Sequence, residues 1–183
     1  SAVPGHFMRR ENMRIERDLI GKVEIGDQFY YGIHTMRALE NFPITGRRIH
    51  PRLVNAMVTV KKAAALANRE VGLLDDKKCA AIADACDFIL EGHLDDQFVV
   101  DVFQTGSGTS TNMNMNEVLS SRANEIMTGR KGGKSPVHPN DHVNLGQSSN
   151  DVIPTTIHMS ALLMINESLY PATEGLQKAL AQK

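Results

Sequence analysis

The chain has 183 residues, a net charge of −1 from 20 Lys and Arg against 21 Asp and Glu, and a hydrophobic share of 42 %. This composition is typical of a globular protein, and the charge balance excludes a general attraction to nucleic acid or to an anionic membrane. No apolar run approaches the ~20 residues that cross a bilayer. We therefore expect neither a nucleic-acid nor a membrane partner.

The first segments of the chain differ sharply in pattern. Residues 1–12 lack the long apolar stretch of a signal peptide, and we interpret them as a disordered leader or tag remnant. Residues 13–25 alternate charged and apolar side chains, which favours an extended arm or a hairpin. Residues 34–40 are typical of one or two helical turns that end before Pro43.

Four longer helices are predicted after this region from apolar residues at three- and four-residue spacing. They run from about Pro51 to Val71, from about Asp75 to Leu90, from about Thr111 to Met127 and onward from about Ser149, with Pro171 expected to break or kink the last one. The expected buried stripes are Leu53, Met57, Val60, Ala64 and Ala67 in the first helix, Cys79, Ile82, Cys86 and Ile89 in the second, and Val152, Ile153, Ile157, Ala161 and Ile165 in the fourth. The two cysteines lie two helical turns apart, too far for a disulfide, so buried reduced thiols in a cytoplasmic protein are expected.

A Gly/Ser/Thr-rich loop precedes the third helix. In Gln104–Asn112 (QTGSGTSTN), two glycines alternate with hydroxyl residues. Glycines allow close approach of the backbone to a ligand, and a helix N-terminus favours an anion. A simple turn with a Thr N-cap explains the same pattern. Asn112, Asn114 and Asn116 cost helix propensity, which a buried hydrogen-bond network or a ligand site would offset; Asn112 and Asn116 share a helix face that Asn114 does not.

Two further polar segments follow a Gly/Lys/Pro-rich hinge. His138-Pro139-Asn140-Asp141-His142 has the character of a turn whose side chains cap the local backbone. A metal site from its histidines and Asp141 has no supporting spacing signature, so we expect no metal. Ser148-Ser149-Asn150 then precedes the fourth helix. One such residue suffices as an N-cap, and the surplus suggests that the others face a ligand.

These segments resemble a known family. Gly106–Val118 (GSGTSTNMNMNEV), Val137–Asp151 (VHPNDHVNLGQSSND) and Tyr30–Gly46 (YYGIHTMRALENFPITG) are similar, in sequence, order and spacing, to the N-terminal part of the aspartase/fumarase superfamily. The resemblance implies a mainly α fold: an N-terminal helical domain over residues 13–144, and over 145–183 the first helix of a long helical bundle. It also implies a homotetramer whose active sites combine loops from three subunits, and no cofactor.

The resemblance also assigns roles. Ser107 and Thr109 match hydroxyls that hold a substrate carboxylate, and Ser148, Ser149 and Asn150 match the second polar loop of the active site. His138, Asn140 and Asp141 match a second dicarboxylate site, although Ser135 stands where the family often has Arg. The family's Thr-His pair and its loop with the serine base are not found in this sequence. The chain is therefore expected to be the N-terminal part of a longer lyase, without catalytic residues of its own and inert by itself.

Two activities, and one role without catalysis, remain open. Thr105–Gly108 and the Ser148-Ser149 pair resemble fumarases, which add water to fumarate to give L-malate in the tricarboxylic acid cycle. Tyr31–Thr35 and Asn41–Gly46 resemble aspartases, which release ammonia from L-aspartate. Residues that contact the leaving group should distinguish the two activities better than peripheral residues do. The two polar loops therefore favour fumarase. The third alternative is an inert, self-associating helical module.

Overall fold

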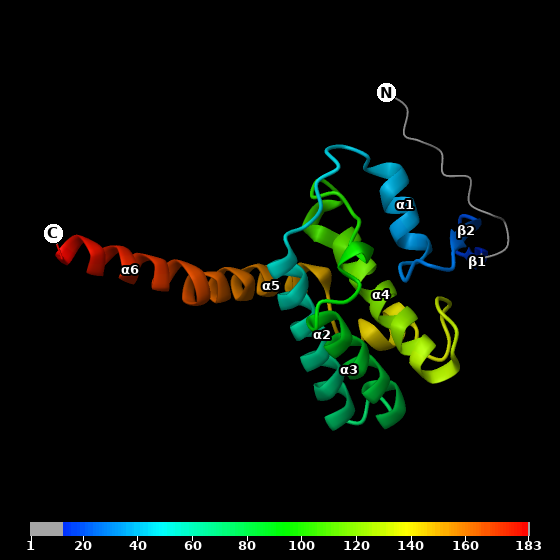
Figure 1. The fold of residues 1–183 in the computed structure, drawn as a ribbon. Coiled ribbons are helices and arrows are strands. Elements are labelled where there is room, and N and C mark those ends of the chain that lie inside the picture. Colours follow the sequence, from blue (N-terminus) through cyan, green and yellow to red (C-terminus); the bar gives the residue numbers. More distant parts are fainter. Residues whose placement is uncertain (1–12, 183) are drawn as a thin grey trace.

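The computed structural model describes residues 13–182, and within this range the chain is mainly helical, as predicted (Figure 1). The elements in chain order are β1 (Met13–Arg17), β2 (Lys22–Gly26), α1 (Ile33–Asn41), α2 (Pro51–Glu70), α3 (Asp76–Leu90), η1 (Asp95–Gln97), η2 (Gly106–Gly108), α4 (Thr109–Thr128), η3 (Pro139–Val143), α5 (Ser149–Met164), η4 (Ile165–Leu169) and α6 (Tyr170–Ala181). The leader expected at residues 1–12 lies outside the described residues.

The N-terminal segment forms a hairpin, one of the two expected alternatives. Strands β1 and β2 are antiparallel, with Met13 opposite Gly26 and Arg17 opposite Lys22. At the turn, the Asp18 carboxylate accepts hydrogen bonds from the backbone amides of Ile20 and Gly21, at 2.9 Å each. An Asp that bonds the backbone two and three residues ahead holds such a turn.

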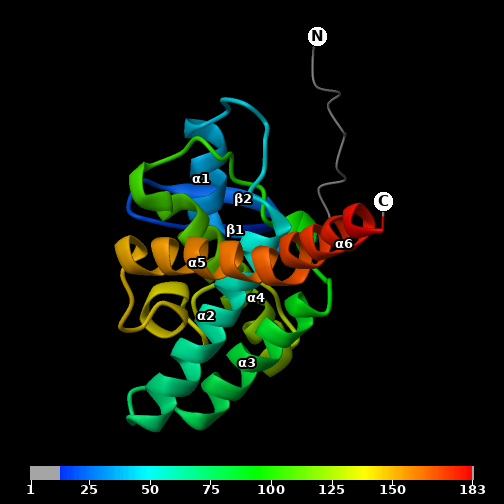
Figure 2. The same cartoon turned by 90° about the vertical axis from the view of Figure 1, so that its left-hand side faces the viewer.

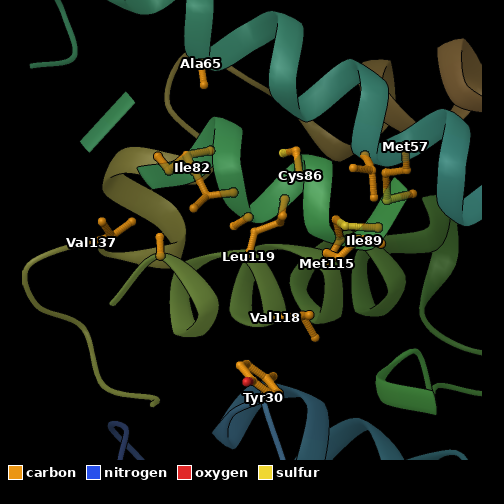
Figure 3. Close-up of a cluster of buried hydrophobic side chains, with 14 of the residues drawn as sticks. Tyr30, Met57, Ala65, Ile82, Cys86, Ile89, Met115, Val118, Leu119 and Val137 are labelled. Carbon is orange, nitrogen blue, oxygen red and sulfur yellow. The ribbon is translucent and has the colours of Figure 1, made fainter. Parts of the chain in front are cut away.

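The hydrophobic core lies between α2, α3 and α4. Ile82, Cys86 and Ile89 of α3 are fully buried against Met57 of α2 and Met115 of α4 (Figure 3). The predicted stripe of the second helix is confirmed, as is the burial of the two cysteines as free thiols. Each large apolar side chain so buried stabilises the fold by about 1.5–3 kcal/mol. This core fixes the start of α4, where the first polar loop ends.

The predicted stripe of α2 is confirmed in part. Met57 is fully buried, Leu53, Val60 and Ala64 are partly buried, and Ala67 is exposed. The fully buried residues are Val54, Ala56, Met57, Val58, Lys61 and Ala65. The helix packs against both α3 and α5, so its buried face is wider than a single stripe. Lys61, at the centre of that face, also interrupts the apolar spacing on which the prediction was based.

The predicted stripe of α5 is confirmed at its start and wrong from Ile157 onward. Val152 is buried and Ile153 partly so, but Ile157 and Ile165 are 49 % and 47 % exposed. The reason is visible in Figures 1 and 2, where α5 crosses the body of the molecule and α6 projects away from it. Beyond the crossing, apolar side chains such as Leu169 and Leu176 are exposed.

Pro171 does not break this helix. The segments α5, η4 and α6 follow one another without interruption from Ser149 to Ala181. The turn η4 just before the proline is a π turn, in which the Tyr170 amide donates to the carbonyl of Ile165. A wider turn accommodates a residue that lacks the usual N–H and whose ring crowds the preceding turn. Within residues 13–182, no helix combines the length and the apolar character that crossing a membrane would need.

Candidate functional site

The first polar loop has a strained backbone. Ser107 adopts φ 60° and Gly108 φ 65°, both in the left-handed region. That conformation is unfavourable for a serine, and such strain is often found at functional sites. Glycine at position 108 is favoured for a second reason, because a Cβ there would lie 3.0 Å from Ile153 Cδ1. A larger residue would require the Ile153 side chain to shift.

Capping of α4 is carried out by residues other than the predicted ones. The Gln104 Oε1 atom accepts from the Thr111 amide at 2.7 Å, and Thr105 Oγ1 accepts from the Ser110 amide at 3.2 Å. The N-cap residue itself, Gly108, offers no side chain. The expectation of a Thr at the N-cap was wrong, because Gly108 occupies that position and Gln104 and Thr105 bond the first amides from further upstream. Ser107 and Thr109 are consequently not needed as caps, and both are exposed.

In the second polar loop, too, one residue caps the helix and the others do not. Ser148 is the N-cap of α5, and its hydroxyl accepts from the Asn150 amide at 3.3 Å. Ser149 is partly buried and turns toward the first loop, with its Oγ 3.3 Å from Thr109 Oγ1. The Asn150 side chain is exposed and makes no hydrogen bond within residues 13–182.

The structure therefore brings the starts of α4 and α5 together. Each helix N-terminus carries partial positive charge, while the amides of Ser110, Thr111 and Asn150 are already bonded by the caps. The hydroxyls of Thr109 and Ser149 add rotatable donors. A hollow of about 330 Å³ opens beside the first loop, with Thr105 and Gly108 on one side and the apolar side chains of Leu53, Phe103 and Ile153 in its wall. The hydroxyl residues in its lining are Thr105 and Thr111, whereas Ser107, Thr109 and the Ser148–Asn150 loop lie outside the lining. Helix ends with hydroxyls suit a small anion. Asp151, in the first turn of α5, is the acidic residue nearest in sequence to the Ser148–Asn150 loop.

A buried polar network lies behind these loops. Asn144 Oδ1 accepts from Lys61 Nζ at 2.8 Å, from Asn112 Nδ2 at 3.1 Å and from Asn116 Nδ2 at 3.3 Å. Asn114 points elsewhere: its Nδ2 donates to the carbonyl of Gln97 at 3.0 Å. The predicted division of the asparagines between two faces is thus confirmed. The network satisfies the amide groups of Asn112 and Asn116, but the Oδ1 atoms of both are buried without a hydrogen-bond partner among residues 13–182. The network therefore accounts for part of the propensity cost, and the ligand site stays a prediction.

The segment around His138 forms a separate cluster. His138 caps the turn η3, and its Nδ1 accepts from the amides of Asn140 and Asp141 at 3.1 Å each. The expected capping residues, Asn140 and Asp141, are therefore the donors, and their side chains are exposed. Among residues 13–182, no hydrogen bond connects these three residues to the Thr109–Ser149 contact, and no group of three metal-ligating side chains gathers there or elsewhere.

Several residues of this region escaped the sequence reasoning. Gln104 and Thr105 replace the expected cap, while Asn144, Gln147 and Lys61 support the second loop from behind. Lysine is rarely fully buried. Lys61 lies four residues after the buried Met57 and four before the buried Ala65, and that spacing was the signal that could have revealed it.

Known proteins share this sequence and fold. A sequence profile described as "Lyase" matches residues 21–183. A class II fumarate hydratase from Rickettsia conorii is 50 % identical over 173 residues, which span 94 % of this chain and 37 % of that protein. An aspartate ammonia-lyase from a Bacillus species is 49 % identical over 172 residues, 94 % of this chain and 36 % of that protein.

The solved structures agree with these relatives. A recombinant class II fumarase from Schistosoma mansoni superposes with a TM-score of 0.80 at 42 % identity, over 84 % of this chain and 33 % of that one. The chain thus spans little more than a third of the length of the relatives it matches. It belongs to the lyase family that includes class II fumarate hydratases and aspartate ammonia-lyases.

Proposed function

We propose that the protein is a fumarate hydratase that adds water reversibly to fumarate to give L-malate, and that this chain supplies its first two dicarboxylate-binding loops. The observation that carries the proposal is the 3.3 Å approach of Thr109 Oγ1 to Ser149 Oγ at the starts of two helices. In this proposal Ser107 and Thr109 bind one carboxylate, and Ser148, Ser149 and Asn150 bind from the facing loop.

The proposed chemistry explains why hydroxyls and helix ends suit this place. Removal of a proton beside a carboxylate puts additional negative charge on that carboxylate in the intermediate. Donors already oriented toward it stabilise this charge without reorganising. The strained backbone at Ser107 supports the assignment, since the residue neither caps the helix nor bonds another side chain among the described residues.

A second candidate activity is release of ammonia from L-aspartate. It is supported by the nearly equal identity to the Bacillus aspartate ammonia-lyase, 49 % against 50 % for the Rickettsia fumarate hydratase. The two activities share the carboxylate-binding loops and differ in the leaving group. We favour the hydratase because Thr105–Gly108 and the Ser148-Ser149 pair resemble fumarases.

The assembly and the location belong to the same proposal. We propose a homotetramer in the cytoplasm, acting in the tricarboxylic acid cycle, with the domain boundary near residue 144 and the helix from Ser149 onward as part of a bundle. Leu162, Leu169, Leu176 and Leu180 are 57–64 % exposed, which supports packing of this helix against other helices. His138, Asn140 and Asp141 are proposed as a second dicarboxylate site.

The deciding experiment is an assay of the full-length protein with fumarate, L-malate and L-aspartate. Conversion of fumarate to malate without ammonia release from aspartate supports the proposal; the opposite result supports the second candidate. The Thr109→Val and Ser149→Ala variants are expected to raise KM at least about tenfold, since each removes a donor worth about 1.4 kcal/mol. Turnover of none of the three substrates would overturn both activities and leave another lyase of the superfamily or the inert, self-associating module.

A further inference from the structure

Lys61 is a cation in the core without an acidic partner. It is 0 % exposed, and its ammonium donates to Asn144 Oδ1 at 2.8 Å and to Gln147 Oε1 at 2.9 Å. None of the ion pairs within residues 13–182 includes Lys61. A buried ammonium that meets only amide oxygens is costly. Burial lowers the pKa of Lys61 to about 7, because removal from water disfavours the charged form.

The two acceptors, Asn144 and Gln147, also form hydrogen bonds with the backbone of the segment that leads into the second polar loop. Gln147 immediately precedes Ser148, and its Nε2 donates to the carbonyl of Val143 at 2.9 Å. Asn144 Nδ2 donates to the carbonyl of Gln147 at 3.1 Å. The ammonium therefore binds both side chains, and these side chains in turn bind the backbone of their own segment.

The same contacts reach the first polar loop. Asn144 Oδ1 also accepts from Asn112 and Asn116, and Asn112 lies one helical turn after Thr109 in α4. The hydrogen bonds behind the two loops thus share one acceptor, Asn144 Oδ1. The bond from Lys61 is the shortest of the three. Cations and polarised amides strengthen each other in a low-dielectric interior.

We infer that Lys61 is a positioning residue that holds the Ser148–Asn150 loop against the start of α4, so that hydroxyls of both loops reach one dicarboxylate. The inference rests on the proposed function for the identity of the ligand, but not for the link between Lys61 and the loop. Lys61 touches no substrate in this arrangement; it acts through Asn144 and Gln147.

The test compares Lys61→Met with Lys62→Met in the full-length protein. Lys62 is its neighbour on α2 and forms an ion pair with Asp87 near the surface, so it is a matched control. Hydrogen exchange of the amides of residues 144–150 is expected to be at least about tenfold faster in Lys61→Met, with the protection of α3 retained. KM for the substrate that the protein turns over should rise about tenfold or more, and kcat should change less.

Each outcome decides the inference. Unchanged exchange in residues 144–150 overturns it, and so does faster exchange with an unchanged KM. Equal effects in Lys62→Met would show a general loss of stability and would also overturn it. Should Lys61→Met fail to fold, Gln147→Leu removes one of the two acceptors and is expected to act in the same direction. If the wild type turns over none of the three substrates, the proposed function fails, while the exchange comparison still tests the link between Lys61 and the loop.

Discussion

Glu117, in the middle of α4, caps the start of α1 through Thr35. Its Oε2 accepts from the Thr35 hydroxyl at 2.7 Å and from the Thr35 amide at 3.0 Å. The same carboxylate accepts from the amides of Gly32 and His34 at 2.9 Å each. Burial raises the pKa of Glu117, and the hydrogen bonds from Thr35 and the backbone oppose that rise. A carboxylate distant in sequence thus supplies the cap that the residue before α1, Gly32, cannot.

Glu117→Gln should therefore destabilise the fold by about 2–4 kcal/mol. The amide would turn N–H donors toward backbone donors, and the positive end of α1 would lose its counter-charge. Urea unfolding of the two proteins measures the difference. Thr35→Val, which removes only the hydroxyl contact, is the milder control and should cost about 1 kcal/mol. Equal stability of wild type and Glu117→Gln would refute the capping role.

At Ser107, stability and binding are expected to change in opposite directions. Ser107→Gly should raise the free energy of unfolding by about 0.5–1 kcal/mol, because glycine adopts φ 60° with less strain. Ser107→Ala keeps the strain and should leave stability within about 0.5 kcal/mol of the wild type. Both variants lose the hydroxyl, so both should raise KM for the dicarboxylate. Denaturant titration and steady-state kinetics on the same three proteins separate the effects; a gain in stability with alanine would contradict the strain argument.

Asp101 makes the fold sensitive to acid. Burial would raise the pKa of Asp101, but hydrogen bonds from the amides of Phe103, Thr45 and Gly46 and from the Thr45 hydroxyl hold it at about 2. A carboxyl group whose folded pKa is depressed stabilises the fold above its unfolded pKa of about 3.9. That contribution is lost as pH falls toward 2. The stability difference between wild type and Asp101→Asn should shrink as pH falls from 5 to 2.5, as followed by thermal unfolding; a constant difference would exclude the linkage.

Lys61 should titrate near neutrality. Burial lowers its pKa to about 7, an effect that the neighbouring Cys86 thiol opposes. Between pH 7 and about 10.4 the unfolded chain keeps a proton that the folded chain has released, so this group makes stability rise with pH over that window. The ¹³Cε shift of Lys61, assigned by its absence in Lys61→Met, should show a midpoint near 7. A midpoint near 10 would mean that the ammonium is solvated.

The sequence alone determined the helical class and the burial of Cys79 and Cys86, and it limited residues 13–25 to an extended arm or a hairpin. These features follow from local periodicity and from turn residues, which act over a few positions. It also placed hydroxyl residues before two helices, and it separated Asn112 and Asn116 from Asn114, because a helix face is set by residue spacing alone.

Tertiary structure decided which of those residues serve as caps and which face outward. Gln104 and Thr105 cap α4, which leaves Ser107 and Thr109 exposed, and Ser149 meets Thr109 across 40 positions of sequence. Lys61 and Glu117 acquire their roles in the same way, from partners 83 and 82 residues away. A charge in the core is stable only where distant segments supply enough donors or acceptors, and local sequence does not encode that convergence.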